Sequence, residues 1–317
     1  MLPTLLAVLA LVLGAVLLTA GAEAFAEHVT AASSRLGVSV LALGILLAGA
    51  EPEEAVTAML AAGQGHPALA AGDAIGANLV ILTLTVGLAA LVTRLPVGRR
   101  VVEYAAAASV AGALAVLFLW NGVLGRLEAT VLLASYVAGV VWVWRREQEP
   151  PLLGELAELA EEAGEAEAEE PSRALLVVLL GLLGMVAGGF FAVRGAEGLV
   201  DAFGVTESVV GLTVLALATS AEMVALVLAA HRRGLTEIAL AGAVGSVAYN
   251  ATVSLGLAAW VDPLAIGRGS PVTTVALATA VLPLVLLAGR RTGWFPRALG
   301  VALVASYVLA AGWLFAG

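Results

Sequence analysis

The chain lacks cysteine and lysine altogether, and only 12% of its residues are charged. Without cysteine it can form neither disulfide bonds nor thiolate metal sites. Its 15 basic residues are all arginines, placed singly or in pairs between apolar segments, so the sequence offers no basic patch for nucleic acid. Hydrophobic residues make up 61% of the chain and the mean hydropathy is +1.04, which excludes an ordinary soluble domain. The 317 residues therefore predict a protein that crosses the lipid bilayer several times.

The net charge of −9 is concentrated in one segment. Residues 145–173 hold ten glutamates and three arginines, a local charge of −7. We interpret this segment as a hydrophilic linker between two halves. A cation-sensing loop is the alternative, but the glutamates lack the Asp, Asn and Gly spacing of a calcium-binding loop. The predicted division is therefore a first half at 1–144, an acidic linker at 145–173 and a second half at 174–317.

Apolar windows of about 20 residues are long enough to cross a bilayer. The first window resembles a signal peptide, but it lacks a positive leading region. Its Gly21-Ala22-Glu23 also recurs as Gly195-Ala196-Glu197 at the start of the second half, so we interpret it as a retained helix. The predicted spans are 3–26, 36–61, 68–92, 101–119, 122–144, 174–200, 206–230, 235–260, 270–289 and 295–316.

The arginines between these spans predict the orientation. Twelve fall on one side and three on the other, and arginine excess marks the cytoplasmic side. This places the acidic linker in the cytoplasm and both termini outside. With five spans per half, the second half must insert upside down, so the predicted fold is an all-α membrane protein of ten transmembrane helices in two inverted five-helix repeats. The larger group is Arg35, Arg94, Arg99, Arg100, Arg145, Arg146, Arg173, Arg232, Arg233, Arg290, Arg291 and Arg297, and the smaller is Arg126, Arg194 and Arg268.

A buried acid occurs twice at matching positions. One constant offset along the chain relates Glu53 to Glu222 and Gly76 to Gly245. An ionisable residue within a membrane span costs roughly 2.5–3.5 kcal/mol on insertion scales, so it usually marks an ion or proton site. Finding the cost at two matched positions indicates a transporter built from two repeats, with Glu53 and Glu222 as candidate metal ligands. The same offset relates Thr83 to Thr252, Thr85 to Ser254 and Gly87 to Gly256.

The surroundings of these two acids supply oxygen ligands. Pro52 is expected to disrupt a helix within the membrane and free backbone carbonyls. Glu51 and Glu54 flank Glu53, and three carboxylates so close in the sequence cannot all face lipid, so one of them could carry a proton. In the second half, hydroxyl groups precede Glu222. Calcium and sodium favour this mixture of carboxylate, hydroxyl and carbonyl oxygens.

The partner spans add polar groups to an apolar background, namely Asp73 and Asn78 in the first half and Ser246, Tyr249 and Asn250 in the second. The two asparagines could bind an ion or simply bridge two helices. The hydroxyl groups of Thr83, Thr85, Thr252 and Ser254 fit ordinary helix packing. Glu23 and Glu197 lie near span ends, where snorkelling to the interface accounts for them. His28, His66 and His231 fall near span ends or loops and are not expected to bind metal.

The segments around these residues resemble the cation/calcium exchanger superfamily, which includes sodium/calcium and calcium/proton antiporters. The second half carries the closer match, in VTESVVGLTVLALATSAEMV and GSVAYNATVSLGLAAWVDPL. The first half matches in LAGAEPEEAVTAM and GHPALAAGDAIGANLVILTLTVGLAALV. The resemblance implies a calcium site between the second, third, seventh and eighth helices. The residues implied are Glu53 and Glu222, with Thr219 and Ser220 as hydroxyl or carbonyl ligands and Asn250 facing the site.

The sequence also departs from the pattern of that superfamily. The expected Gly-Thr-Ser-Leu-Pro-Glu reads Ala-Gly-Ala-Glu-Pro-Glu at 48–53, so both hydroxyls are missing. Gly-Ser-Asn reads Gly-Ala-Asn at 76–78, and Ile81 stands where asparagine is expected. These losses weaken the case for several sodium sites, whereas Glu51, Asp73 and Glu54 favour proton coupling. The counter-ion is therefore open between sodium and protons.

The predicted function is an antiporter in the inner (plasma) membrane that exports calcium or a related divalent cation in exchange for Na⁺ or H⁺, without a cofactor. Its partners are inorganic cations and the lipid bilayer, and the sequence does not distinguish a monomer from a homo-oligomer. A Na⁺/H⁺ exchanger of the same fold is the alternative. A cation channel is less favoured because no segment resembles a filter loop. An enzyme is disfavoured, since no nucleophile–base pair or His-rich metal motif lies inside a span.

Overall fold

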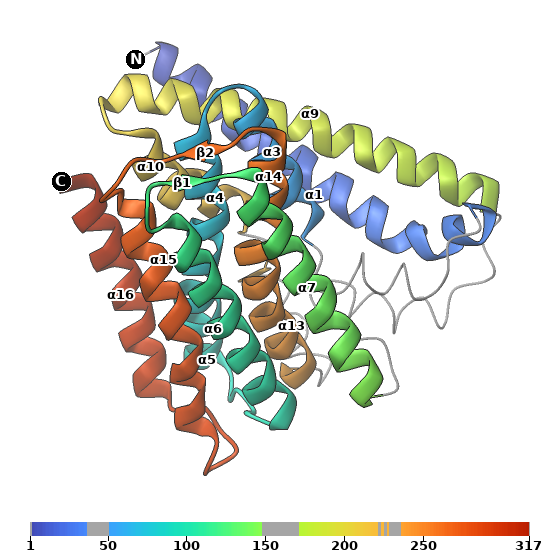
Figure 1. Ribbon diagram of the computed structural model, residues 1–317, viewed down its shortest axis with the longest axis vertical. Helices are drawn as coiled ribbons and strands as arrows, with labels where there is room; N and C mark the ends of the chain where they lie inside the picture. Colours follow the sequence, from blue (N-terminus) through green and yellow to red (C-terminus); the bar gives the residue numbers. More distant parts are fainter. Residues whose placement is uncertain are drawn as a thin grey trace.

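The computed structural model describes residues 2–36, 51–147, 171–220, 223–224, 227 and 236–316, and the protein is helical over nearly all of them (Figure 1). The first half contains α1 (Leu2–Leu36), α3 (Pro52–Gly63), α4 (Pro67–Val80), η1 (Ile81–Thr85), α5 (Val86–Val92), α6 (Arg99–Leu119), β1 (Val123–Leu124) and α7 (Arg126–Glu147). The second half contains α9 (Pro171–Phe203), α10 (Glu207–Val210), η2 (Gly211–Leu215), α11 (Ala216–Thr219), α13 (Thr236–Tyr249), η3 (Asn250–Ser254), α14 (Leu255–Val261), β2 (Leu264–Ala265), α15 (Pro271–Val281), η4 (Leu282–Gly289) and α16 (Arg297–Ala316).

Within the described residues, eight helical stretches are long and apolar enough to cross a membrane. They correspond to eight of the ten predicted spans. The other two predictions, 36–61 and 206–230, lie partly outside the described residues. Their described parts are α3 and the apolar stretch Glu207–Thr219. The multi-span helical architecture is confirmed, and the count of ten stays a prediction.

The offset that relates Glu53 to Glu222 also relates the bounds of the helices. α4, η1 and α5 in the first half correspond to α13, η3 and α14 in the second, and the paired segments η1 and η3 begin and end at matching residues. Both of these short segments are π-helical, as is η2. The wider turn shifts the side chains that follow relative to those before it, and such turns are frequent at functional sites. The hydrophobic pattern of the sequence did not reveal them.

Helices α1 and α9 lie side by side at a steep angle to the other helices (Figure 1). Regularly spaced glycines on both helices allow this contact. A Cβ atom on Gly14 would lie 2.7 Å from the carbonyl oxygen of Gly188, and one on Gly21 would lie 2.6 Å from that of Gly181. The order of these contacts shows that the two helices run antiparallel, and the missing side chains let their backbones approach closely.

The remaining helices pack across the two halves, and corresponding helices make corresponding contacts. α5 packs on α16 while its counterpart α14 packs on α7, and α6 packs on α13 while α15 packs on α4. β1 and β2 pair antiparallel through Val123–Ala265 and Leu124–Leu264. At the opposite end of α6, Pro96 forms an antiparallel bridge with Trp294. The halves are thus joined near both ends of the bundle.

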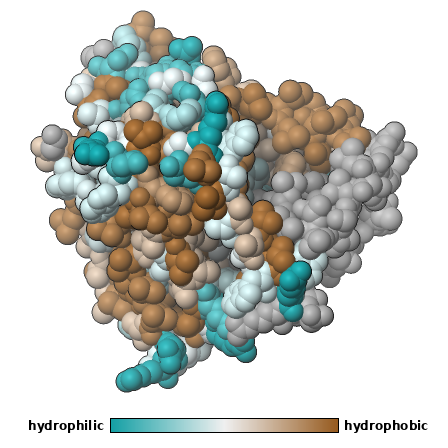
Figure 2. All heavy atoms as spheres, viewed as in Figure 1, coloured by the Kyte–Doolittle hydropathy of each residue, from teal (hydrophilic) through white to brown (hydrophobic). Residues whose placement is uncertain are grey.

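Burial separates central from peripheral helices. In the spans Pro67–Val92 and Leu240–Val261, 78% and 83% of the most apolar window is buried, compared with 17% in Arg126–Arg145 and in Arg297–Ala316. Apolar side chains cover the flank of the bundle, while hydrophilic ones gather towards its upper and lower ends (Figure 2). Lipid-facing flanks and polar ends are what a membrane-spanning bundle requires. The polar residues of the two central spans are therefore enclosed by protein.

Candidate cation-binding site

A helix begins in the first half at the position where one ends in the second half. Helix α3 begins at Pro52 with Glu51 as its N-cap, and proline suits the first helical position because its missing N–H needs no partner there. Helix α11 has Ser220 as its C-cap, and Ser220 is related to Glu51 by the offset between the repeats. The amide of Glu54 donates to the Glu51 carbonyl at 3.1 Å, and that of Met223 donates to the Ser220 carbonyl at 3.3 Å. The end of α11 thus falls at the position that matches the start of α3, with no proline there, which the sequence did not reveal.

Four carboxylates are buried near the start of α3. Glu51, Glu53, Glu54 and Asp73 are each at most 1% exposed. The charges of Glu54, Asp73 and Glu51 lie close enough to interact. All four acids come from the first half, three at the start of α3 and one on α4. Burying them is costly unless hydrogen bonds, protons or cations compensate.

The groups that contact these acids come from the second half. The Ser220 hydroxyl donates to Glu54 Oε1 at 2.5 Å, and the Thr219 hydroxyl lies 3.3 Å from Asp73 Oδ1 as a donor. The Asn250 Nδ2 donates to Glu51 Oε2 at 3.3 Å. Acids of one half are therefore paired with hydroxyls and an amide of the other, between the second, third, seventh and eighth predicted spans.

Asn250 is itself held in place, because the Ser254 hydroxyl donates to its Oδ1 at 3.0 Å. Ser254 therefore does more than pack one helix on another. By contrast, the hydroxyls of Thr83 and Thr252 donate to carbonyls four residues earlier, at Leu79 and Ala248, as ordinary packing hydroxyls do.

Three buried oxygens at the site have no hydrogen-bond partner among the described residues: Glu54 Oε2, Asp73 Oδ2 and Asn78 Oδ1. The Asn78 amide nitrogen donates to the Val247 carbonyl at 3.1 Å, which leaves its oxygen as the group without a donor. Buried polar atoms normally have partners, and carboxylate, amide and hydroxyl oxygens are the ligands of hard cations. The donor set therefore suits a cation.

Two tyrosines, Tyr136 of the first half and Tyr249 of the second, lie near the buried acids. Tyr249 lies near the charges of Glu53, Glu51 and Glu54, and its ring meets that of Tyr136 edge to face, with centroids 5.6 Å apart. The Tyr136 hydroxyl is buried without a hydrogen-bond partner among the described residues. The sequence singled out Tyr249 but not Tyr136, because nothing in the α7 pattern distinguishes this tyrosine from one that faces lipid.

The other predicted ligands differ in placement. Glu222 lies outside the described residues, so the structure does not place it relative to Glu53. Ser246 is buried, with its hydroxyl donating to the Gly242 carbonyl of its own helix at 3.3 Å. Among the described residues, no three His, Asp or Glu side chains are grouped so that they could hold a metal ion by themselves. A cation bound here would also need the hydroxyl and amide oxygens.

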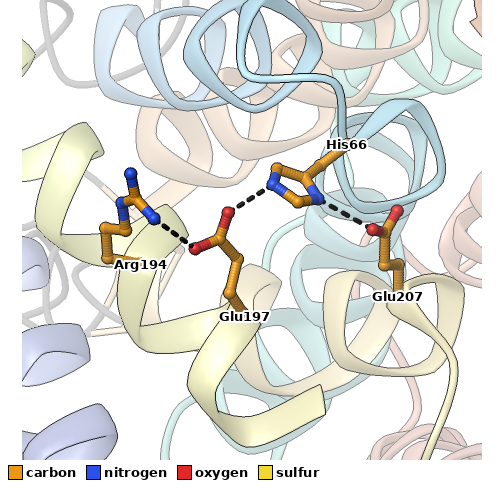
Figure 3. A network of polar contacts seen from close by, with 4 residues as sticks. All are labelled: His66, Arg194, Glu197 and Glu207. Atoms are coloured by element: carbon orange, nitrogen blue, oxygen red, sulfur yellow. Dashed lines mark hydrogen bonds and ion pairs between the residues drawn. The ribbon is translucent and has the colours of Figure 1, made fainter. Parts of the chain in front are cut away.

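A second polar network surrounds His66, to which the sequence assigned no role. Its Nδ1 lies 2.8 Å from Glu207 Oε1, and its Nε2 contacts Glu197, whose other oxygen accepts from Arg194 at 3.1 Å (Figure 3). Glu197 is thus one member of an ion-paired network, and the sequence interpretation of a snorkelling side chain does not describe it. No sequence signal could have joined side chains that lie in different halves of the chain.

A family model and two relatives match most of the chain. The family model described as "Sodium/calcium exchanger protein" matches residues 6–145 and 173–316. A relative from Alkalimonas amylolytica, described as "Putative antiporter CaxA", is 28% identical over 291 residues, covering 88% of this chain and 89% of its own. The "Inner membrane protein YrbG" of Escherichia coli (strain K12) is 26% identical over a 324-residue alignment, covering 96% of this chain and 95% of its own.

Solved structures share the fold. The sodium-calcium exchanger NCX_Mj soaked with 10 mM Na⁺ and 10 mM Sr²⁺ superimposes with a TM-score of 0.62 at 21% identity, over 98% of both chains. The same exchanger soaked with 2.5 mM Na⁺ and 0.1 mM Sr²⁺ gives a TM-score of 0.61 at 22% identity, over 98% of this chain and 99% of that one.

Proposed function

The chain belongs to the sodium/calcium exchanger protein family, a family of multi-pass membrane ion antiporters, and we propose that it exports calcium or a related divalent cation in exchange for Na⁺ or H⁺. The transport cycle uses no cofactor and no covalent chemistry. The protein acts in the inner (plasma) membrane, a location supported by the relative named an inner membrane protein.

The proposed architecture is ten transmembrane helices in two inverted five-helix repeats, at 1–144 and 174–317, with the linker 145–173 in the cytoplasm and both termini outside. Three observations support it. Helices α1 and α9 pack antiparallel, and one constant offset relates the helix bounds of the two halves. In addition, α5 packs on α16 just as its counterpart α14 packs on α7, the counterpart of α16.

The proposed cation site has Glu53 and Glu222 as its metal ligands. One observation carries the proposal: buried carboxylates of the first half meet hydroxyls and an amide of the second half at the centre of the bundle. A hard divalent cation compensates buried negative charge and satisfies the oxygens that lack donors. The further oxygen ligands that we propose are those of Thr219, Ser220, Asn250, Asn78 and Ser246.

For the counter-ion, we propose Glu51, Asp73 and Glu54 as candidates to carry protons. Each is buried and has a contact from the other half, and Ile81 supplies no oxygen where the family pattern has an amide. Sodium stays the other candidate, because hydroxyl and carboxylate oxygens also suit it.

Calcium uptake into proteoliposomes tests this function. We expect uptake only when an opposing sodium or proton gradient is imposed, each tested alone. Glu53→Gln should abolish it, because the cation loses a carboxylate that offsets its dehydration. Glu23→Gln, the same change at an exposed acid of α1, should leave it unchanged.

Other outcomes would change the assignment. Uptake that needs no opposing ion would indicate a channel. Sodium–proton exchange without calcium flux would indicate the Na⁺/H⁺ exchanger. Calcium flux at the parental rate in Glu53→Gln would exclude the proposed site.

A further inference from the structure

His66 lies in the turn between α3 and α4, with its ring held between two carboxylates of the second half (Figure 3). Its side chain is 24% exposed, and those of its partners Glu197 and Glu207 are 23% and 32% exposed. The network is therefore partly shielded from water, and its contacts are less screened than those of a fully exposed ion pair.

The geometry depends on how many protons the ring carries. Both ring nitrogens face a carboxylate oxygen, Nδ1 that of Glu207 and Nε2 that of Glu197. A neutral imidazole has only one N–H, so one nitrogen would present a lone pair to a carboxylate. With both nitrogens protonated, the ring donates to both acids and its charge attracts them. Among the described residues, the remaining charged group in this network is Arg194, which donates to the far oxygen of Glu197.

The network joins three elements that bear on the cation site. The turn that carries His66 links α3, which holds Glu53 and Glu54, to α4, which holds Asp73. Glu197 lies on α9, whose most extensive packing is with α1. Glu207 begins α10, which continues through η2 and α11 to Thr219 and Ser220.

The position in the fold predicts which solution reaches this network. One end of the bundle holds the α3–α4 turn, the paired strands β1 and β2, and Arg268. The opposite end holds the bridge between Pro96 and Trp294. The end with the α3–α4 turn is the one with few arginines, which the proposed topology places outside. The pH that matters for His66 is therefore the external pH.

We propose that His66 is a positioning residue that makes transport sensitive to external pH. Doubly protonated, it clamps α9 and α10 to the α3–α4 turn and holds this arrangement of helices. When it loses a proton, one of the two contacts becomes repulsive, the clamp releases, and the helices change places more readily. Histidine is the side chain that changes charge between about pH 5 and 8, so external acid slows the cycle. This inference rests on the proposed antiport activity.

The test is calcium self-exchange by the full-length protein in proteoliposomes of uniform orientation. Exchange of labelled for unlabelled calcium needs no counter-ion gradient, so a change in external pH does not change a driving force. We expect the parental rate to rise on the order of three- to tenfold between about pH 5.5 and 8. His66→Gln should be faster than the parent at low pH and should lose much of the pH dependence, because it removes the charge; the dependence that remains reports protons at the buried acids of the cation site. His66→Lys, which keeps a positive charge throughout this range, should stay slow at high pH.

His28→Gln is the matched control, because its ring Nδ1 lies 3.0 Å from the Ala24 carbonyl of its own helix. It should keep the parental pH profile. Glu207→Gln removes one of the two carboxylates that contact His66 and should reduce the dependence of the exchange rate on external pH. This variant tests the inference if His66→Gln fails to insert into the membrane. A parental pH profile in both His66→Gln and Glu207→Gln, or a parental rate that falls as external pH rises, would overturn the inference. Absence of calcium exchange in the parent would instead refute the proposed function.

Discussion

Three hydrogen bonds between acids of the first half and groups of the second half differ in length. Ser220 approaches Glu54 to 2.5 Å, whereas the contacts of Asp73 and Glu51 are both 3.3 Å long. Short hydrogen bonds to ionised groups are the strong ones, with net contributions of about 1.5–3 kcal/mol. Ser220 is therefore the hydroxyl whose removal should disturb the site most.

We expect Ser220→Ala to weaken the apparent affinity for calcium on the order of tenfold, because Glu54 loses its donor and the site loses an oxygen. The measurement is the transport rate as a function of calcium concentration. Thr252→Ala removes a hydroxyl that bonds to the Ala248 carbonyl at 2.6 Å. This control should change the affinity less than about twofold. Equal effects of the two substitutions would show that the Ser220 hydroxyl has no special role.

Substitutions of Asp73 and Glu23 compare the loss of a buried charge with the loss of an exposed one. Asp73→Asn keeps the size of the side chain but removes a fully buried charge, so the apparent calcium affinity should fall by about tenfold or more. Glu23→Gln on the exposed face of α1 should have no measurable effect. The same calcium titration measures both variants, and parental affinity in Asp73→Asn would place that carboxylate outside the binding site.

At the scale of elements, the site depends on how closely α4 crosses η2 and α11. A Cβ atom added to Gly76 would lie 2.6 Å from Ala216 Cβ and 2.8 Å from Leu212 Cα. Gly72 and Gly211 face each other across the same crossing, and a Cβ atom on either would lie 3.0 Å from the other's Cα. These glycines set the separation between the helix that carries Asp73 and the helix that carries Thr219.

Gly76→Ala should therefore lower both stability and transport. Overpacking of this kind costs typically about 1–3 kcal/mol, and the displaced helix would separate Asp73 from Thr219. Thermal unfolding in detergent and calcium uptake measure the two effects. Gly139→Ala is the control, because nothing lies within 4 Å of its added Cβ and alanine favours a helix. A parental melting temperature in Gly76→Ala would mean that the crossing adjusts without cost.

The sequence predicted the helices better than their local geometry. The apolar windows revealed the long spans because a membrane helix must be apolar along about 20 residues. The π-helical turns of η1, η2 and η3 leave that hydrophobic pattern unchanged, so no periodicity could disclose them. The start of α3 at Pro52 was predictable from the proline, whereas the end of α11 at Ser220 has no such residue.

Most of the candidate site was recognisable in outline. Glu53 and Asp73 stood out because acids in apolar segments are rare, and both are buried. The partners could not be assigned, since the contacts Ser220–Glu54 and Asn250–Glu51 join side chains 166 and 199 positions apart. They depend on rotamers and helix crossings, which are properties of the folded molecule.

At the scale of the whole molecule, the two ends of the bundle should face opposite solutions. The absence of cysteine makes single-cysteine labelling direct. Arg268 and Arg291 are both exposed, the first near β2 and the second near Trp294. A membrane-impermeant maleimide applied to intact cells should label Arg268→Cys but not Arg291→Cys, because arginine excess marks the cytoplasmic side. Labelling of both from the same side would refute the proposed topology.

The division of acids and hydroxyls between the halves also bears on how such a chain could have arisen. Two halves related by one constant offset have the form of a duplicated gene, whose ancestral product would have paired with a second copy of itself. The present halves no longer carry the same groups at these positions. The counterparts of Glu51, Glu54 and Asp73 are Ser220, Met223 and Gly242, so two first halves would bring their acids together without hydroxyl donors. Two second halves would lack these three acids. Each half now depends on the other for the partners of its buried groups.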